Sequence, residues 1–254
     1  HDITNHISDW ERLTHPDDIV FMKKAFQKQL YANESYVFEF RMKHSNGSWV
    51  WIQGSGAVIE YDKETQEPIR LCGTHQDITK RKLIELREKS RTKILELIAN
   101  GEELSFILNS IVQGVEEDNS AMLCSILLLD DSGMHLLNGA APSLPNIYTK
   151  AINGIEIGLG VGSCGTAAFT NERVIVEDIQ NHPYWQPYKT LASTANLASC
   201  WSEPIRSTKG EVLGTFAIYH HEVNAPTAAH ITLITQVARL ASIAIEKTQA
   251  NLAI

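Results

Sequence analysis

The chain has 254 residues, a length that predicts two domains because a single hydrophobic core is usual only in shorter chains. Hydrophobic residues make up 43% and charged residues 20% of the sequence, which is the composition of a folded protein and excludes a disordered one. The net charge of −8, without a basic cluster, argues against nucleic acid or an anionic membrane as a partner.

The sequence also indicates where the protein resides. No apolar run approaches the roughly 20 residues that span a bilayer, and the N-terminus lacks the pattern of a signal peptide. The cysteines are sparse and unclustered, unlike a secreted disulfide framework; they are Cys72, Cys124, Cys164 and Cys200. We therefore predict a cytoplasmic protein, and the start at His1, without Met, indicates a piece of a longer chain.

The first third of the chain predicts a helical region followed by three strands. Residues 9–31 have helical spacing, with proline and acidic residues in the first turn. Residues 36–44 and 49–61 alternate as half-buried strands, and Asn46-Gly47 between them supplies the positive φ of a tight hairpin. A third strand is expected at residues 69–76.

Two phrases in this part carry a resemblance to a known family. They are Trp49-Val50-Trp51-Ile52 and Gly73-Thr74-His75-Gln76-Asp77-Ile78-Thr79. Together they resemble the later two-thirds of a PAS sensor domain, over residues 7–82, whereas the two opening strands of that family have no counterpart. In that family an Asp-Ile-Thr turn ends the last strand and a helix leaves from it, which implies a relay role for Asp77 and Thr79.

The segment after this turn is charged and helix-prone. Its apolar residues fall on steps of three and four; they are Leu83, Leu86, Ile94, Leu97 and Ile98. This seam either packs on the chain's own domains or forms a parallel coiled-coil dimer that passes motion along its axis. Asn100-Gly101 is expected to end the helix, and Glu102-Glu103 to open the next one.

The second half of the chain alternates apolar runs with turns. Residues 122–129 and 134–140 predict a hairpin around Asp130-Asp131-Ser132-Gly133. Further strands are expected at 174–178, 198–205 and 211–219, and a helix from about Thr227 closes the chain.

This order resembles a GAF domain over residues 100–247. Three phrases carry the match: residues 160–169, residues 174–178, and Ser202-Glu203-Pro204-Ile205 with the strand that follows it. The segment 139–145 is also similar to GAF domains of bacterial signalling proteins whose outputs are GGDEF or EAL domains or histidine kinases. The resemblance implies a bacterial sensory protein.

The candidate ligand pocket rests on two stretches. Four glycines precede a helix expected at Thr166, whose start could face a ligand, but the spacing matches no phosphate motif, so a packing role for the glycines is favoured. In the GAF family the loop at residues 181–188 lies over the pocket, although its rings could equally complete the core. The pocket candidates are Cys164, Thr166, Asp178, Tyr184, Trp185, Tyr188 and Trp201.

No catalytic or metal-binding pattern stands out. The phrase around Cys164 is similar to that of free methionine sulfoxide reductases, but no Cys lies beside Asp178 or at residues 194–196, where those enzymes hold reacting thiols. Both Cys164 and Cys200 are then expected to be small buried hydrophobic side chains. We predict no enzyme and no metal site, and the sequence names no cofactor.

The last helix shows two apolar stripes where docking on a sheet needs only one. The first is Ile231, Ile234, Ala238, Ala241 and Ile245, and the second is Leu233, Val237, Leu240 and Ala244. The additional apolar stripe predicts that this helix pairs with the same helix of a second copy. The alternative is a helix buried on two sides within one domain.

Taken together, the sequence predicts an α+β protein of two sensor domains, each an antiparallel sheet flanked by helices. The expected parts are a partial PAS domain at residues 1–82, a helical linker at 83–101, and a GAF domain with a C-terminal signalling helix at 102–254. The predicted function is to bind a small ligand or partner and to relay this, as a homodimer, to a C-terminal output domain. The alternatives are a redox enzyme of the methionine sulfoxide reductase type and a ligand-free dimerisation scaffold.

Overall fold

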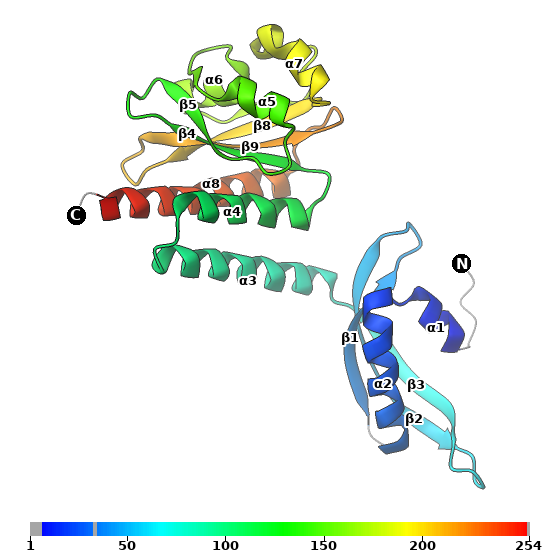
Figure 1. Ribbon diagram of the computed structural model, residues 1–254. Helices are drawn as coiled ribbons and strands as arrows, with labels where there is room; N and C mark the ends of the chain where they lie inside the picture. The colour runs from blue at the N-terminus through cyan, green and yellow to red at the C-terminus, as the bar shows by residue number, and fades with distance from the viewer. Residues whose placement is uncertain (1–6, 33–34, 253–254) are drawn as a thin grey trace. The chain divides into compact units, whose positions relative to one another are not determined.

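The computed structural model describes residues 7–32 and 35–252. The chain divides into two units, residues 1–89 and 90–254, and the helix α3 (Thr79–Ala99) continues from the first into the second (Figure 1). Both units contain an antiparallel sheet with helices against it, which confirms the predicted α+β class.

The first unit contains a three-stranded sheet in the order β1-β2-β3. Its elements are α1 (Ile7–Leu13), α2 (Pro16–Ala32), β1 (Tyr36–Lys43), β2 (Trp49–Tyr61) and β3 (Pro68–Asp77). The three predicted strands are therefore present, and Gly47 has the positive φ of +89° that the hairpin turn needs. Met22 from α2 and Phe40 from β1 are each only 2% exposed and are the most buried hydrophobic side chains described in this unit.

The helix α3 ends where the sequence predicts. Gly101 has a φ of +73°, and its N–H donates to the carbonyl of Ile98 while the N–H of Glu102 donates to that of Leu97. This pair of hydrogen bonds is a Schellman motif, which glycine favours because it lacks the Cβ that penalises the left-handed region. The next helix, α4 (Leu104–Asp118), begins after it.

The second unit is built on a six-stranded antiparallel sheet in the order β6-β5-β4-β9-β8-β7. The strands are β4 (Leu123–Leu129), β5 (His135–Ala140), β6 (Ile155–Glu156), β7 (Val174–Val176), β8 (Ser199–Arg206) and β9 (Val212–His220). The remaining helices are α5 (Asn146–Ile152), α6 (Gly162–Thr170), the 3-10 helix η1 (Pro183–Tyr188), α7 (Lys189–Thr194) and α8 (Ala228–Leu252). The helices α5, η1 and α7 are not predicted from the sequence, because they are short elements in segments rich in turn formers.

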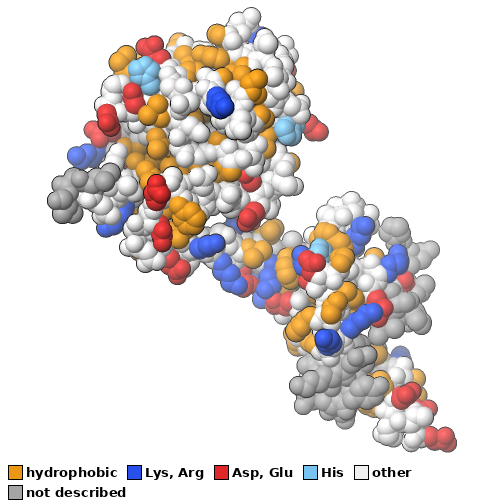
Figure 2. Space-filling model, viewed as in Figure 1, with side chains coloured by type: hydrophobic (Ala, Val, Ile, Leu, Met, Phe, Trp, Pro, Cys, Tyr) orange, Lys and Arg blue, Asp and Glu red, His pale blue; other side chains and the backbone are white. Residues whose placement is uncertain are grey.

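The sheet separates two cores. On one face, α4, α8 and the end of α3 pack around Trp201 and Phe216; on the other face, α5, α6 and α7 lie over Cys200 and Tyr219 (Figure 1). On the face of this unit seen in Figure 2, hydrophobic side chains are spread over the surface between scattered charged ones.

The apolar seam of α3 is divided. Ile94 and Ile98 are buried in the core with α4 and α8, and Leu97 packs against them. Leu83 and Leu86 are 41% and 43% exposed. The end of the seam thus packs on its own domain, and only its beginning is left for another partner.

Both stripes of α8 are used within the domain. From the first stripe Ile234 and Ala241 are buried, and from the second Val237 and Ala244, because α8 contacts the strands β8 and β9 as well as α4. This agrees with the alternative of a helix buried on two sides, and pairing of α8 between copies stays a prediction. By length and composition α8 could also cross a bilayer, but part of its surface is buried in the domain core.

Candidate functional site

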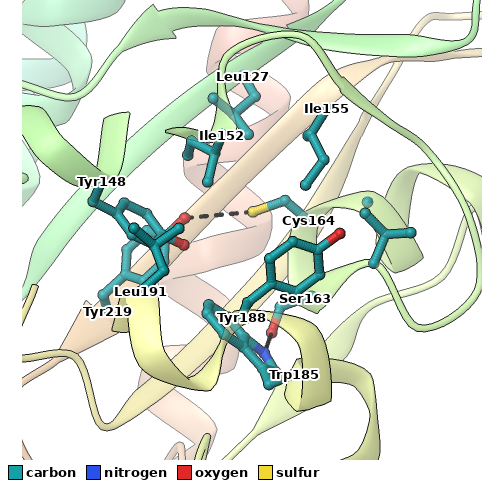
Figure 3. A pocket seen from close by; sticks show the side chains of 13 residues that line it. Leu127, Tyr148, Ile152, Ile155, Ser163, Cys164, Trp185, Tyr188, Leu191 and Tyr219 are labelled. Carbon is teal, nitrogen blue, oxygen red and sulfur yellow. Dashed lines mark hydrogen bonds between the residues drawn. The ribbon is translucent and has the colours of Figure 1, made fainter. Parts of the chain in front are cut away.

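A small cavity lies between the sheet of the second unit and the helices α5, α6, η1 and α7 (Figure 3). Its volume is about 20 Å³, room for roughly one water molecule. Four aromatic rings border it, from Tyr148, Trp185, Tyr188 and Tyr219, together with the thiol of Cys164. None of the described side chains that line it is charged. Three of the sequence-predicted candidates, Cys164, Trp185 and Tyr188, meet here.

The glycine-rich turn shapes one wall of the cavity. Gly162 opens α6 with a φ of +57°, and a Cβ on Gly165 would lie 2.7 Å from Val161, so the turn needs glycine for backbone freedom and for close packing. The predicted helix start at Thr166 is wrong, because α6 begins four residues earlier. The hydroxyl of Thr166 instead donates to the carbonyl of Gly162 at 2.7 Å and does not line the cavity, as a Thr within a helix bonds the carbonyl one turn back.

Residues 181–188, the segment considered as a lid, contain η1, which borders the cavity through Trp185 and Tyr188, and α7 follows it. Trp185 is 2% exposed, and its Nε1–H donates to the hydroxyl of Ser163 at 3.0 Å. That hydroxyl in turn donates to the carbonyl of Cys200 at 3.1 Å. The lid, α6 and β8 are thereby joined by consecutive hydrogen bonds. Tyr184 packs against this core without lining the cavity.

Beneath the lid lie two tyrosines and two thiols. The Cys164 Sγ is 3.5 Å from the Tyr219 hydroxyl, and the rings of Tyr148 and Tyr219 meet edge to face at 5.6 Å. Burial raises the pKa of both phenols well above the ordinary value, so both remain protonated and can donate hydrogen bonds. Burial likewise raises the pKa of Cys200.

Trp201 does not belong to the cavity, which corrects the prediction. Successive side chains of a strand point to opposite faces, so Cys200 faces the cavity and Trp201 faces α8. The Nε1–H of Trp201 donates to the carbonyl of Asn224 at 3.0 Å. Its ring lies 4.4 Å from that of His220 and 5.3 Å from that of His230.

Asp178 also lies away from the cavity. It follows β7 and accepts hydrogen bonds from the side-chain amide of Asn181 at 2.6 Å and from the backbone N–H of Gln180 at 3.0 Å. These bonds lower the pKa of its carboxyl group. Because both carboxylate oxygens of Asp178 accept these hydrogen bonds, Asp178 fixes the backbone at the start of the segment that borders the cavity.

The predicted relay residues join the first sheet to α3. The backbone N–H of Thr79 donates to Asp77 at 2.8 Å, and the hydroxyl of Thr79 accepts from the backbone N–H of Trp51 at 2.9 Å. The hydrogen bonds from Thr79 lower the pKa of Asp77. The first turn of α3 is therefore attached to the middle strand of the sheet.

The sequence analysis missed a second attachment at the same turn. Glu39 on β1 contacts Lys82 and Arg81, each at 2.6 Å, and the Lys82 ammonium lies 5.5 Å from the centre of the Trp51 ring. Hydrogen bonding by Lys82 and then Arg81 lowers the pKa of Glu39. The only sequence signal was a carboxylate on the polar face of a predicted strand, which does not reveal a partner 43 positions away.

Within residues 7–32 and 35–252, no three His, Cys, Asp or Glu side chains lie together as a metal site would require.

Comparisons with known proteins find one domain family for each of the two parts of the chain. A family model of the GAF domain matches residues 102–246, and one of the PAS fold matches residues 1–75. A curated protein of Methanosarcina acetivorans, described as a methyl sulfide methyltransferase-associated sensor, is 36% identical over 239 residues. The match covers 94% of this chain and 24% of that protein, so the chain spans about a quarter of its relative's length.

Solved structures share the fold of the second unit. The GAF domain of an Acinetobacter phosphoenolpyruvate-protein phosphotransferase is 18% identical with a TM-score of 0.53, covering 66% of this chain and 98% of that one. The corresponding domain from Coxiella burnetii is 21% identical with a TM-score of 0.53, covering 65% and 96%. A free methionine-R-sulfoxide reductase from Neisseria meningitidis, solved with its substrate, is 18% identical with a TM-score of 0.52, covering 66% and 92%.

These identities are low enough that the structural likeness shows the fold alone. The family models and the curated sensor carry the assignment, and they confirm the predicted order of domains. The chain belongs to the GAF domain family, and a match to the PAS fold precedes its GAF domain.

Proposed function

We propose that the chain is the sensory part of a larger signal-transduction protein and that its GAF cavity binds a small, uncharged molecule. The observation that carries this is the cavity wall, which combines four aromatic rings with a thiol and has no charged side chain. Burying a charged ligand there without a partner of opposite sign would be costly. Phenol and thiol groups can orient a neutral ligand through one or two hydrogen bonds.

The size of the cavity narrows the class of ligand. A volume of about 20 Å³ has room for roughly one water molecule, so even a ligand of three or four non-hydrogen atoms enters only if the covering segment moves. Because the curated relative is described as a sensor associated with a methyl sulfide methyltransferase, dimethyl sulfide is our first probe. Its polarisable sulfur suits contacts with the edges of aromatic rings, as in rings packed against methionine.

The proposed signal passes through the sheet. The strand β8 places Cys200 beside the cavity and Trp201 against the α4 and α8 layer, so a ligand that shifts β8 also shifts the packing of α8. A ligand moves such an equilibrium only by its differential affinity for the two arrangements. We further propose a homodimer, with the exposed beginning of α3 and the end of α8 as contacts, and an output domain of the GGDEF, EAL or histidine kinase class outside this chain.

The setting is proposed as cytoplasmic, with no nucleic-acid or membrane partner for this part. The predicted bacterial source is not confirmed by the comparisons, since the curated relative is archaeal. The source of the protein, bacterial or archaeal, therefore stays open.

The test combines two measurements on the whole chain. Native mass spectrometry of the freshly purified protein detects a retained molecule, and ligand-observed NMR measures binding of dimethyl sulfide. Leu191→Trp adds a ring at the cavity wall, where we expect binding to fall at least tenfold. Ile147→Trp is the matched control, because Ile147 is 55% exposed on α5 and does not line the cavity. Equal binding by both variants and the wild type would rule out the cavity as the site.

The alternative is an enzyme that reduces methionine sulfoxide, favoured only by the two buried thiols beside the cavity. We propose no enzymatic activity, because no Cys stands beside Asp178 or at residues 194–196, where the similar reductases hold their reacting thiols. If the wild type reduces methionine sulfoxide and Cys164→Ser does not, the cavity is an enzyme active site and the proposed ligand-sensing role is wrong. A chain that binds no molecule in either measurement would favour the scaffold.

A further inference from the structure

Two buried cysteines lie in one cluster on the cavity side of the sheet, although they are 36 positions apart. Cys164 comes from α6 and Cys200 from β8, and they belong to one buried cluster. Tyr219 is the direct cross-strand partner of Cys200, and the Tyr219 hydroxyl lies 3.5 Å from the Cys164 Sγ (Figure 3). Cys164 is thus placed over the Cys200–Tyr219 pair.

The backbones at this point are also held close. The hydroxyl of Ser163, the residue before Cys164, donates to the carbonyl of Cys200 at 3.1 Å. The α6 helix is therefore fixed against β8 next to the two sulfurs. This proximity is what a disulfide requires, because the Cα atoms of bridged cysteines are usually 4.4–6.8 Å apart.

The surroundings of the pair are unusually polar for a core. The hydroxyls of Ser202 and Thr215 are buried and have no hydrogen-bond partner among the described residues, and their proximity helps to lower the pKa of Cys164. Hydrogen bonding by Cys200, above all, lowers the pKa of Cys164 against the opposing effect of burial. Polar groups that stabilise a sulfur anion make one thiol of a pair the better nucleophile.

We propose that Cys164 and Cys200 form a reversible disulfide when the protein meets a peroxide, and that this bond closes the cavity. Cys164 is the attacking thiol because it lines the cavity, whereas Cys200 does not. The inference rests on the thiol pair and does not depend on which ligand the cavity binds.

The chemistry balances in two steps. The Cys164 thiolate attacks one oxygen of hydrogen peroxide, the O–O bond breaks, and Cys164 becomes a sulfenic acid while hydroxide leaves and takes a proton. The Cys200 sulfur then attacks the sulfenic sulfur, the S–O bond breaks and water leaves. Two thiols and one peroxide give one disulfide and two waters, and a dithiol reductant reverses the change.

The disulfide would alter the cavity directly. Its sulfurs are about 2 Å apart, closer than any hydrogen bond, so α6 must move toward β8 and the Cys164–Tyr219 contact is lost. The lid follows, since Trp185 is attached to α6 through Ser163.

The experiment treats the folded chain with hydrogen peroxide, blocks the remaining thiols in denaturant, and identifies the linked peptides after trypsin. Cleavage at Lys150, Arg173, Lys189 and Arg206 places the two cysteines in separate peptides. All measurements use Cys72→Ser, because Cys72 is exposed and can link two copies. We expect a cross-link of residues 151–173 to 190–206, a loss of two of the three remaining thiols, and recovery of both with dithiothreitol.

Two variants separate the roles. In Cys200→Ser, peroxide should leave a sulfenic acid on Cys164 that dimedone traps, and in Cys164→Ser no adduct should form on Cys200. Cys124→Ser is the matched control, since Cys124 is equally buried but lies on the other face of the sheet; it should cross-link like the parent. Circular dichroism establishes that each variant is folded. Retention of all thiols, a cross-link to Cys124, or sulfinic acid on Cys164 with Cys200 still a free thiol would overturn the proposal.

Discussion

The hydroxyl of Thr79 accepts a hydrogen bond of 2.9 Å from the backbone N–H of Trp51. This contact joins the first residue of α3 to the middle strand of the PAS sheet, while the Thr79 N–H donates to Asp77. The last strand and the helix that leaves it are therefore held by the same side chain. It explains in physical terms why a threonine suits this turn.

Replacing Thr79 by Ala should loosen the start of α3. The change removes the acceptor of the Trp51 N–H, so we expect a loss of about 1 kcal/mol in the unfolding free energy of the first domain. Hydrogen exchange at the Trp51 amide should become faster. Thr79→Ser keeps the hydroxyl and should behave like the wild type; unchanged exchange in Thr79→Ala would show that this bond does not hold the helix.

Glu39→Gln should produce a stability difference that depends on pH. The pKa of Glu39 is lowered from 4.5 in the folded chain, so its contribution is present above pH 4.5 and is lost as the pH falls through the lowered pKa. At pH 7 we expect Glu39→Gln to lower the free energy of unfolding by up to about 1 kcal/mol, the scale of a surface ion pair. Urea unfolding of the wild type and of Glu39→Gln at pH 7 and below pH 4 measures this difference in stability. A difference that grows as the pH falls would contradict a stabilising ion pair at Glu39.

Two tryptophans test the two faces of the GAF sheet. Trp185→Phe and Trp201→Phe each remove one indole hydrogen bond and should each cost about 1–2 kcal/mol of stability. Only Trp185→Phe should weaken binding of a cavity ligand, because Trp201 lies on the α8 side. Ligand-observed NMR on both variants measures the binding. An equal loss of binding in the two variants would show that Trp201, on the α8 face of the sheet, also affects the cavity.

Two glycines should respond in opposite directions to alanine. A Cβ at Gly214 would lie 2.1 Å from the carbonyl oxygen of Leu127, so the central strands would be forced apart, and we expect a loss of more than about 3 kcal/mol. Gly114 lies inside α4 with open space around it, so Gly114→Ala should stabilise by about 0.5–1 kcal/mol. Denaturant unfolding of the two variants is the measurement, and similar tolerance of both would refute the packing argument.

The proposed dimer should depend on the exposed beginning of α3. Leu83 and Leu86 are 41% and 43% exposed, and changing both to Glu should shift a dimer toward monomer at micromolar concentration by burying charge in the contact. Leu137→Glu is a control, because Leu137 is similarly exposed (42%) on β5. Native mass spectrometry reads the outcome. A purely monomeric wild type would remove the dimer from the proposed mechanism.

The sequence by itself determined the elements whose signals are local. Alternation in residues 36–44 is a property of one strand, and Asn46-Gly47 and Asn100-Gly101 mark turns through the φ preference of glycine alone. The order of domains was equally visible, because the PAS-like and GAF-like phrases are continuous in the chain. These features need no knowledge of what packs against them.

Only the tertiary structure decided which face or partner each side chain received. Trp201 was expected in the cavity, and the register of β8 places it against α8; both stripes of that helix are covered because α4 and the sheet lie on two of its sides. Glu39 and Lys82, like Cys164 and Cys200, meet across long stretches of sequence. Such meetings depend on sheet register and helix packing, which arise from the sum of many weak contacts and leave no signal at a single position.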